Sequence, residues 1–274
     1  MSTTSQLPEF KRPPVVEVGL SVAFEPVPGL SVPQMGWLWR SQYQSEFPIA
    51  QEQPSVEPGI EEFGVLVPPF EFRFESGVPL SRLWFLKDEL GSEVLQVQRN
   101  WFARNWRRTV AKMEYPRYKR VRRAFERDFG KLESFLGDED LGKIVPTQCE
   151  VTYVNHIERG QVWSSPSEMG KIIRLFKSSE YFLPPPEEVS LDANYVIPGP
   201  AEAPIGRLHI VTRPLYSVAD HQPIIALTLT ARGRPAMESS QGILEFLDLA
   251  HEWVVQGFTS VTSDAAHEEW GRIK

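Results

Sequence analysis

The sequence predicts an α+β protein in which antiparallel strands form one or two sheets and long helices pack on one face. Short segments of alternating apolar and polar residues indicate half-buried strands. Two long segments with apolar residues every three or four positions indicate amphipathic helices. The order strand, helix, three strands, helix occurs twice. We therefore predict a disordered arm over residues 1–14 and two similar halves, 15–142 and 143–274, packed as one globular unit.

Length and composition limit the class of protein. The 274 residues, of which 41% are hydrophobic, are enough for a sizeable core. No apolar run is long enough to span a membrane, and residues 1–14 lack the apolar core of a secretion signal. The single cysteine, Cys149, excludes an internal disulfide framework and a multi-cysteine metal site. These features predict a cytoplasmic protein without a membrane partner.

The first half begins with a strand over residues 15–25, where Val16 to Phe24 alternate with polar or small residues. A helix follows, because Ser31 and Gln34 fit a capping box and Met35 and Leu38 begin an apolar stripe. Residues 48–69 are rich in proline and glutamate, have no period and predict a loop.

Three strands and a long helix complete the first half. The strands are expected at residues 70–74, 83–86 and 94–101, with turn residues between them. The helix is expected at about residues 116–136, since Pro116 suits a first helical turn. Its stripe comprises Tyr118, Val121, Phe125, Phe129, Leu132, Phe135 and Leu136.

The second half repeats this order. A strand is expected at residues 148–157, and Ser165, Pro166 and Glu168 predict a second capped helix, with a buried stripe that ends at Phe176. Three strands at residues 191–197, 207–215 and 224–231 precede a last helix that starts near Ser239 or Ser240. The two halves can join edge to edge into one curved sheet, which would cover edges that otherwise invite aggregation.

Charge is unevenly distributed. The net charge is −7, yet residues 99–131 contain twelve basic and only three acidic residues. Aromatic residues, such as Trp101 and Tyr118, lie among these charges, which is typical of a surface for phosphates or bases. The candidate residues for an anionic partner are Arg99, Asn105, Arg107, Arg108, Arg117, Arg120, Arg123 and Arg127. The alternative is a solvated helix face that pairs with acidic loops at residues 57–62 or 138–140.

Catalytic and metal-binding patterns are incomplete. His251-Glu252 and His267-Glu268 begin a zinc motif, but Val255 and Gly271 stand where the second histidine belongs. Cys149 and His156 would lie about 23 Å apart on one strand, at about 3.3 Å per residue, which is too far for a nucleophile and its base. The sequence therefore predicts no catalytic residue, no metal and no cofactor.

Several short segments together resemble a sporadically distributed bacterial family of conserved proteins of unknown function. These segments are residues 13–18, 95–102, 105–107, 115–118, 151–155 and 267–271. The resemblance implies a bacterial protein but no reaction. Patchy occurrence of this kind is a feature of accessory genes, so a role in defence or toxin neutralisation is a hypothesis.

Three functions are compatible with these observations. The first, which we favour, is a non-catalytic interaction protein that acts through its surface on a protein partner or as a homodimer. The second is nucleic-acid or nucleotide binding by residues 99–131. The third is a small-ligand pocket between the sheet and a long helix. Trp37, Trp39, Trp84 and Trp101 are the expected lining of that pocket.

Overall fold

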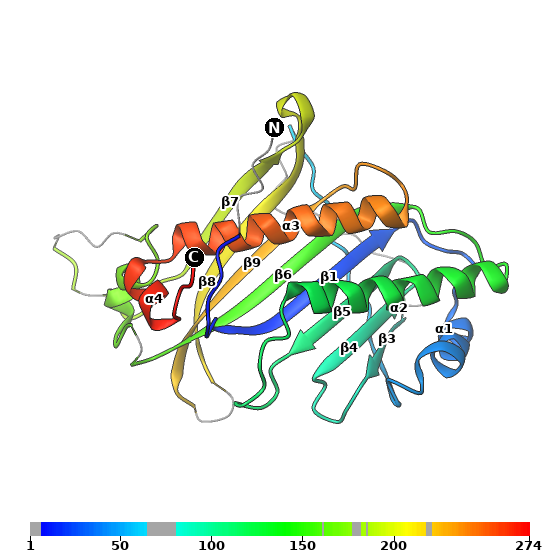
Figure 1. The fold of residues 1–274 in the computed structure, drawn as a ribbon, viewed down its shortest axis with the longest axis horizontal. Coiled ribbons are helices and arrows are strands. Elements are labelled where there is room, and N and C mark those ends of the chain that lie inside the picture. Colours follow the sequence, from blue (N-terminus) through cyan, green and yellow to red (C-terminus); the bar gives the residue numbers. More distant parts are fainter. Residues whose placement is uncertain (1–6, 65–80, 161, 177–181, 185, 218–220) are drawn as a thin grey trace.

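A computed structural model describes residues 7–64, 81–160, 162–176, 182–184, 186–217 and 221–274. Nine strands of this described part of the chain form a single sheet in which every neighbouring pair is antiparallel (Figure 1). Across the sheet the order is β2 (Ile49–Pro54), β3 (Ser81–Leu86), β4 (Glu93–Gln98), β5 (Trp101–Arg107), β1 (Val15–Phe24), β6 (Pro146–Glu158), β9 (Pro223–Gly233), β8 (Pro204–Tyr216) and β7 (Leu191–Pro198).

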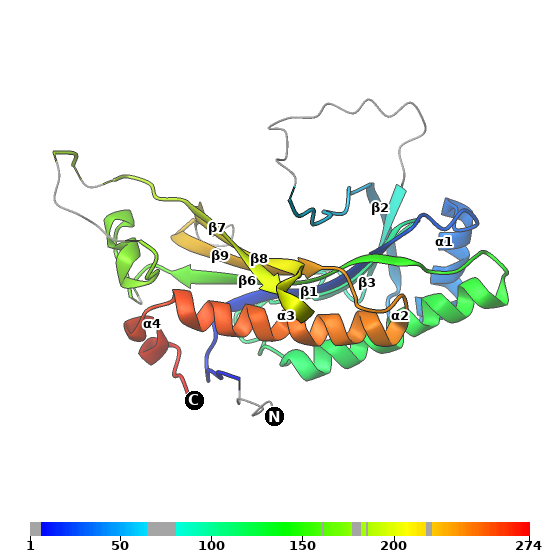
Figure 2. The same cartoon turned by 90° about the horizontal axis from the view of Figure 1, so that it is seen from above.

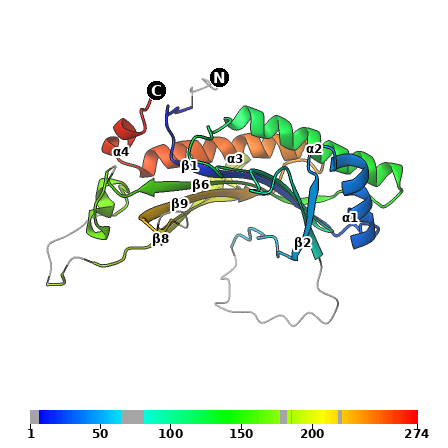
Figure 3. The ribbon, with the colours of Figure 1, turned by 90° about the horizontal axis from the view of Figure 1, so that it is seen from below.

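The described residues include four α-helices, α1 (Val32–Leu38), α2 (Tyr118–Asp138), α3 (Ser240–Val261) and α4 (Asp264–Glu269). The long helices α2 and α3 lie side by side on the same face of the sheet (Figure 2). Residues 55–64, which follow β2, lie on the opposite, open face (Figure 3). The prediction of an antiparallel α+β protein with long helices on one face is confirmed at this level.

The centre of the sheet is the pair β1 and β6. Its register places Leu20 opposite Val151 and Val22 opposite Cys149, and all four side chains are fully buried under the helices. Successive residues of a strand point to opposite faces, so the alternation read from the sequence follows directly from this one-sided burial. One continuous apolar core therefore runs beneath both helices.

The apolar stripes of both helices are buried as predicted. In α2, Phe125 and Phe129 pack against Phe102 of β5, with ring centroids 5.6 and 5.5 Å apart. In α3, the stripe from Ile243 to Val261 packs on β6, β8 and β9. Burial of large side chains of this kind stabilises the fold by roughly 1.5–3 kcal/mol each.

Two predictions for the first half are wrong. Residues 94–101 do not form one strand: β4 and β5 are separate and meet at a tight turn at Arg99 and Asn100. Gln98, Arg99 and Asn100 are three consecutive polar residues that interrupt the apolar alternation, and the prediction did not use this signal. Part of the predicted loop 48–69 is the edge strand β2, whose polar side chains gave no apolar period. The predicted strand at residues 70–74 lies outside the described residues.

The predicted helix after Ser165 is a short 3-10 helix, Pro166–Lys171. Met169, Ile172 and Ile173 are buried as expected, but the chain turns back to meet the end of α3. There the N–H of Arg174 donates to Val261, and the N–H of Ser263 donates to Ile172, both over 2.8 Å. A longer α-helix would lose these bonds.

Neither predicted capping box forms as expected. Ser31 and Ser165 are the N-cap residues of their helices, but neither side chain accepts a backbone N–H. Ser31 bonds to the Gln34 side chain, and Glu168 accepts from Ser164 instead of capping Ser165. The two serines therefore mark the starts of their helices without the bonds that the motif predicts.

Residues 7–14 differ from the disordered arm predicted for residues 1–14. The N–H of Lys11 donates to Gly271 over 3.0 Å, and the N–H of Ile273 donates to Glu9 over 2.8 Å. Phe10 is 5% exposed and meets Phe258 edge-on at 5.5 Å. The arm is ordered because the segment after α4 supplies its hydrogen-bond partners and α3 supplies an aromatic partner.

A buried ion pair fastens α2 to the sheet. Arg104 of β5 donates to the carboxylate of Asp128 over 2.5 Å, and the Asp128 side chain is fully buried. The same Arg104 contacts Glu93, and Arg127 donates to the other oxygen of Asp128 over 2.8 Å. The hydroxyl of Tyr43 donates to the backbone carbonyl of Asp128 over 2.6 Å.

We expect Asp128→Asn and Arg104→Met each to lower the free energy of unfolding by about 3 kcal/mol, because each leaves a buried charge without its main partner. The double change Arg104→Met with Asp128→Leu should recover a large part of that loss. Urea unfolding measures both. Lys87→Met, which removes a more exposed partner of Glu93, is the control and should change stability by less than about 1 kcal/mol. Equal effects of all single changes would contradict a special role for this pair.

Candidate functional site

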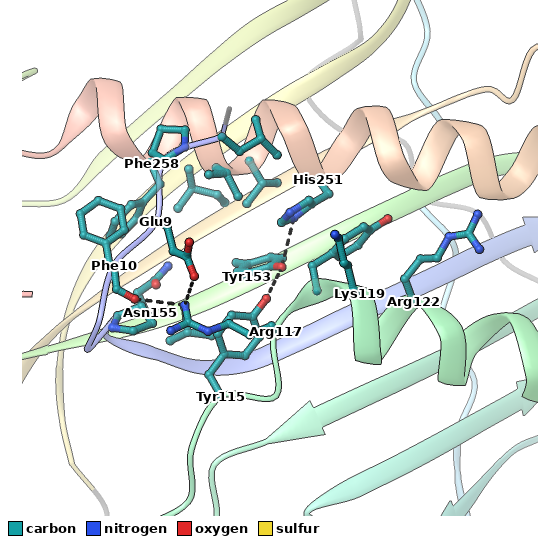
Figure 4. A pocket seen from close by; sticks show the side chains of 18 of the residues that line it. Glu9, Phe10, Tyr115, Arg117, Lys119, Arg122, Tyr153, Asn155, His251 and Phe258 are labelled. Carbon is teal, nitrogen blue, oxygen red and sulfur yellow. Dashed lines mark hydrogen bonds and ion pairs between the residues drawn. The ribbon is translucent and has the colours of Figure 1, made fainter. Parts of the chain in front are cut away.

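A cavity of about 1160 Å³ lies between α2, α3 and the N-terminal arm, over the helix-facing side of β6. Figure 4 shows its side chains converging from these four segments. Its volume is slightly above the roughly 300–1,000 Å³ that is typical of pockets for small molecules. Its apolar lining comes from Val15, Leu229, Val254, Val255 and Phe258, among others.

A chain of hydrogen bonds crosses the floor of the cavity. The hydroxyls of Tyr115 and Tyr153 are 2.6 Å apart, and the Tyr153 hydroxyl is 3.1 Å from Nδ1 of His251 (Figure 4). In the His251 tautomer that is protonated at Nε2, Nδ1 accepts from Tyr153. The three side chains come from the segment before α2, from β6 and from α3, so the chain joins all three.

Tyr118 forms the side wall with α3. Its ring stacks on His251 with centroids 3.7 Å apart and planes 7° from parallel. Its hydroxyl donates to Asp248 over 2.8 Å, and Arg122 forms an ion pair with the same carboxylate over 3.3 Å. These contacts connect the basic α2 with the acidic α3 within one chain.

Burial sets the protonation of this cluster. It lowers the pKa of His251 to about 4, so the imidazole is neutral near pH 7. Burial also raises the pKa of Tyr115 to about 12, and it raises the pKa values of Tyr118 and Tyr153. At neutral pH the cavity therefore presents neutral hydroxyl and imidazole groups.

Asn155 of β6 has an unused acceptor. The side chain is 1% exposed, and its Nδ2 donates to the carbonyl of Leu227 over 3.0 Å. Its Oδ1 is buried and has no hydrogen-bond partner within the described residues, and the residue as a whole belongs to the lining of the cavity. A buried carbonyl oxygen without a donor costs about 1–3 kcal/mol, so a donor that arrives with a ligand would remove that cost.

The rim carries most of the charge. Five basic residues line the cavity, and the acidic residues that line it are Glu9 and Asp248. The basic residues are Arg117, Lys119, Arg122, Arg123 and Lys274. Arg117 donates to the carbonyl of Phe10 over 3.0 Å, which ties the arm to the start of α2.

The eight residues predicted for an anionic partner do not gather on one surface. Only Arg117 and Arg123 line the cavity. Arg99 lies in the β4–β5 turn, and Arg108 follows β5 and reaches the carbonyl of Pro13. Arg120 is exposed on α2. Arg127 pairs with Glu46 and Asp128.

Asn105 and Arg107 point to the open face of the sheet. Asn105 joins Gln96 to Glu17 through hydrogen bonds of 2.7 Å each, and Arg107 donates to Glu17 over 3.2 Å. Arg107 also lies 5.0 Å from the ring of Trp84. These side chains form a ladder across β4, β5 and β1 that is separated from the cavity by the sheet.

The structure also differs from two further expectations, the pairing of the basic helix with residues 57–62 and the tryptophan lining of a pocket. In the acidic segment 57–62, Glu61 pairs with Arg207, His209 and Arg232 of β8 and β9, not with the basic helix. None of the four tryptophans expected in a pocket lines this cavity. Trp84 and Trp101 lie on the open face, Trp37 is 53% exposed on α1, and Trp39 donates to the carbonyl of Phe47.

Sequence reasoning missed the centre of the cavity. The sequence places Tyr118 in the apolar stripe of the long helix and Tyr115 and Tyr118 among the charges of residues 99–131, and it indicates only a strand position for Tyr153. The available signal was a buried-face polar pair, Tyr153 and Asn155, two positions apart on one strand. Tyr153 and Asn155 therefore point to the same face of β6, where purely apolar residues are expected.

Within the described residues, no group of three or more His, Cys, Asp or Glu side chains could hold a metal ion. None of the described helices is long and apolar enough to cross a membrane. Comparison with family models, curated proteins and solved structures gives no match for this chain. The site must therefore be interpreted from its own chemistry.

The low pKa of His251 predicts a pH-dependent stability. In the unfolded chain the imidazole takes up a proton near pH 6.5, but in the folded protein only near pH 4, so protonation favours unfolding. The stabilisation that comes from the neutral His251 is fully present above pH 6.5. It is lost as the pH falls from 6.5 to about 4, and the loss amounts to about 3 kcal/mol.

Denaturant unfolding of the wild type and of His251→Gln between pH 7 and pH 4 measures this contribution. Glutamine cannot titrate but can still accept from Tyr153, so the variant should lose about 3 kcal/mol less stability over this range. Parallel curves for the two proteins would show that His251 titrates normally in the folded state.

Proposed function

We propose that the chain is a non-catalytic binding protein and that its ligand occupies the cavity between α2, α3 and the N-terminal arm. The observation that carries the proposal is a cavity of about 1160 Å³ whose lining includes Asn155, the buried Oδ1 of which has no donor within the described residues. Apolar walls supply most of the binding energy of a small ligand, and a few fixed polar groups orient it.

The chemistry of the cavity favours binding over catalysis. A general acid or base works best when its pKa lies near the working pH, whereas the pKa of Tyr115 is about 12 and that of His251 about 4. Both groups are also held in hydrogen bonds to Tyr153. They are therefore suited to fixing a ligand by hydrogen bonds and stacking.

The wider expectations from the sequence fit this proposal. In a bacterial accessory protein, including one with a role in defence, contact with a protein partner can depend on whether a ligand is bound. Nucleic-acid binding receives less support, because the eight candidate residues lie on different faces of the protein. We therefore place the small ligand first and a ligand-dependent protein contact second.

We also propose that the fold is an internal duplication. β1, β3, β4, β5 and α2 would correspond to β6, β7, β8, β9 and α3, with β2 as an addition at one edge. In support, β5, β4 and β3 follow β1 outward in the same sequence as β9, β8 and β7 follow β6. In such a duplication, a cavity between α2 and α3 lies between the two halves.

Filling the cavity should abolish binding. Val255→Trp places a large side chain into the lining, whereas Val196→Trp changes a 52% exposed residue on β7. With the neutral fluorescent probe N-phenyl-1-naphthylamine, the wild type and Val196→Trp should show saturable binding with one site, and Val255→Trp should show at least a tenfold loss. Far-ultraviolet circular dichroism checks the fold. Equal binding by all three folded proteins would contradict the proposal.

A further inference from the structure

We infer that the cavity takes an organic anion, with its acidic group at the start of α2, its apolar body along α3 and a hydrogen-bond donor directed at Asn155. This inference rests on the proposed function and names the chemical class of its ligand. Four features of the cavity carry it: unbalanced charge, the end of a helix, an apolar wall and the buried acceptor.

The positive charge of the rim is only partly neutralised. Asp248 is paired with Arg122 over 3.3 Å, while Glu9 lies 3.3 Å from Lys274 and 4.0 Å from Arg117. These contacts occupy the two acidic groups of the lining. Lys119 and Arg123 form no ion pair within the described residues, so the rim keeps a surplus of positive charge.

The start of α2 adds to this surplus. The 21-residue helix begins beside the cavity without a side-chain cap and without an acidic residue in its first turn. The first N–H groups of a helix carry a partial positive charge that favours an anion. Arg117, at the N-cap position, has a φ angle of 66°, a strained conformation that its bond to Phe10 helps to hold at the cavity.

The opposite wall is apolar. Val254, Val255 and Phe258 of α3 face the cavity together with Leu229 of β9. A wholly hydrophilic anion, such as inorganic phosphate, would leave this surface in contact with water. The ligand that uses both walls has a charged end and an apolar body.

The floor of the cavity favours a third feature of the ligand, a hydrogen-bond donor. The Oδ1 atom of Asn155 is buried at the base of the cavity and accepts only from a donor. The Nδ2 atom is already engaged with Leu227, so the amide is held in a fixed orientation. A ligand N–H or O–H on the apolar body would reach this oxygen once the neighbouring side chains that close it off from solvent move aside.

Two fluorescent probes separate the charge from the body. 1-Anilinonaphthalene-8-sulfonate has an aromatic body, an N–H donor and a sulfonate, and N-phenyl-1-naphthylamine is the same body without the sulfonate. We expect the natively folded protein to bind both at one site and the sulfonate at least tenfold more tightly, because the rim is cationic.

Removal of the unpaired positive charges should change the binding of the anionic probe alone. Lys119→Gln with Arg123→Gln should weaken sulfonate binding about tenfold and leave the neutral probe unchanged. Lys143→Gln with Arg234→Gln alters the net charge equally at exposed positions outside the cavity and should affect neither probe. Added salt should weaken the binding of the sulfonate probe and leave the binding of the neutral probe unchanged.

Substitutions of Asn155 test whether the ligand donates a hydrogen bond to its side-chain oxygen. Asn155→Leu removes the acceptor and should weaken both probes to a similar degree, since both carry an N–H. Asn155→Ala is the second variant if leucine disturbs β6, and thermal unfolding establishes which variant is native. Unchanged binding of both probes to a native variant would overturn the role of Asn155.

The outcomes distinguish the two proposals. If Val255→Trp abolishes both probes but the Lys119 and Arg123 double variant binds the sulfonate as well as the wild type does, the cavity binds ligands and the anion preference is overturned. If neither probe binds at one saturable site, the proposed ligand-binding function is overturned, and the inferred ligand class is overturned with it. Tighter binding of the neutral probe than of the sulfonate would also overturn the inference.

Discussion

The antiparallel pairing of β1 with β6 is the contact on which the rest of the structure depends. It joins the strands of residues 15–107 to those of residues 146–233 in one sheet, and its buried face carries both long helices. Because α2 and α3 must share that single face, their facing edges meet above β6. Tyr118, Asp248 and His251 occupy the meeting place, so the cavity follows from the way the sheet is joined.

The buried polar groups show how such a junction is fixed. Arg104 and Asp128 hold α2 against β5, where an apolar pair would pack but would not specify one position along the helix. At the cavity, Tyr153 takes the corresponding role for α3 through His251. Both sets of groups lie between helix and sheet, and both constrain how the two helices are placed relative to each other.

The sequence predicted the elements whose residues have one buried face, such as β1, β6, α2 and α3. It failed where the physical cause was not periodic. The β4–β5 turn is made by only two polar residues, and the segment after Ser165 is shaped by bonds to residues 261–263, distant in sequence. The cavity was out of reach for a similar reason: Tyr115, Asn155 and His251 come from three segments, and only the fold shows that they meet.

The paired segments 9–12 and 270–273 have a consequence for protein synthesis. Glu9 and Phe10 line the cavity, and backbone hydrogen bonds with residues 270–273, which are distant in sequence, hold the segment that contains them in place. A nascent chain on the ribosome can assemble most of the sheet before residues 270–273 emerge. The cavity is completed only after those residues have left the exit tunnel, so ligand binding would be confined to chains whose translation has passed that point.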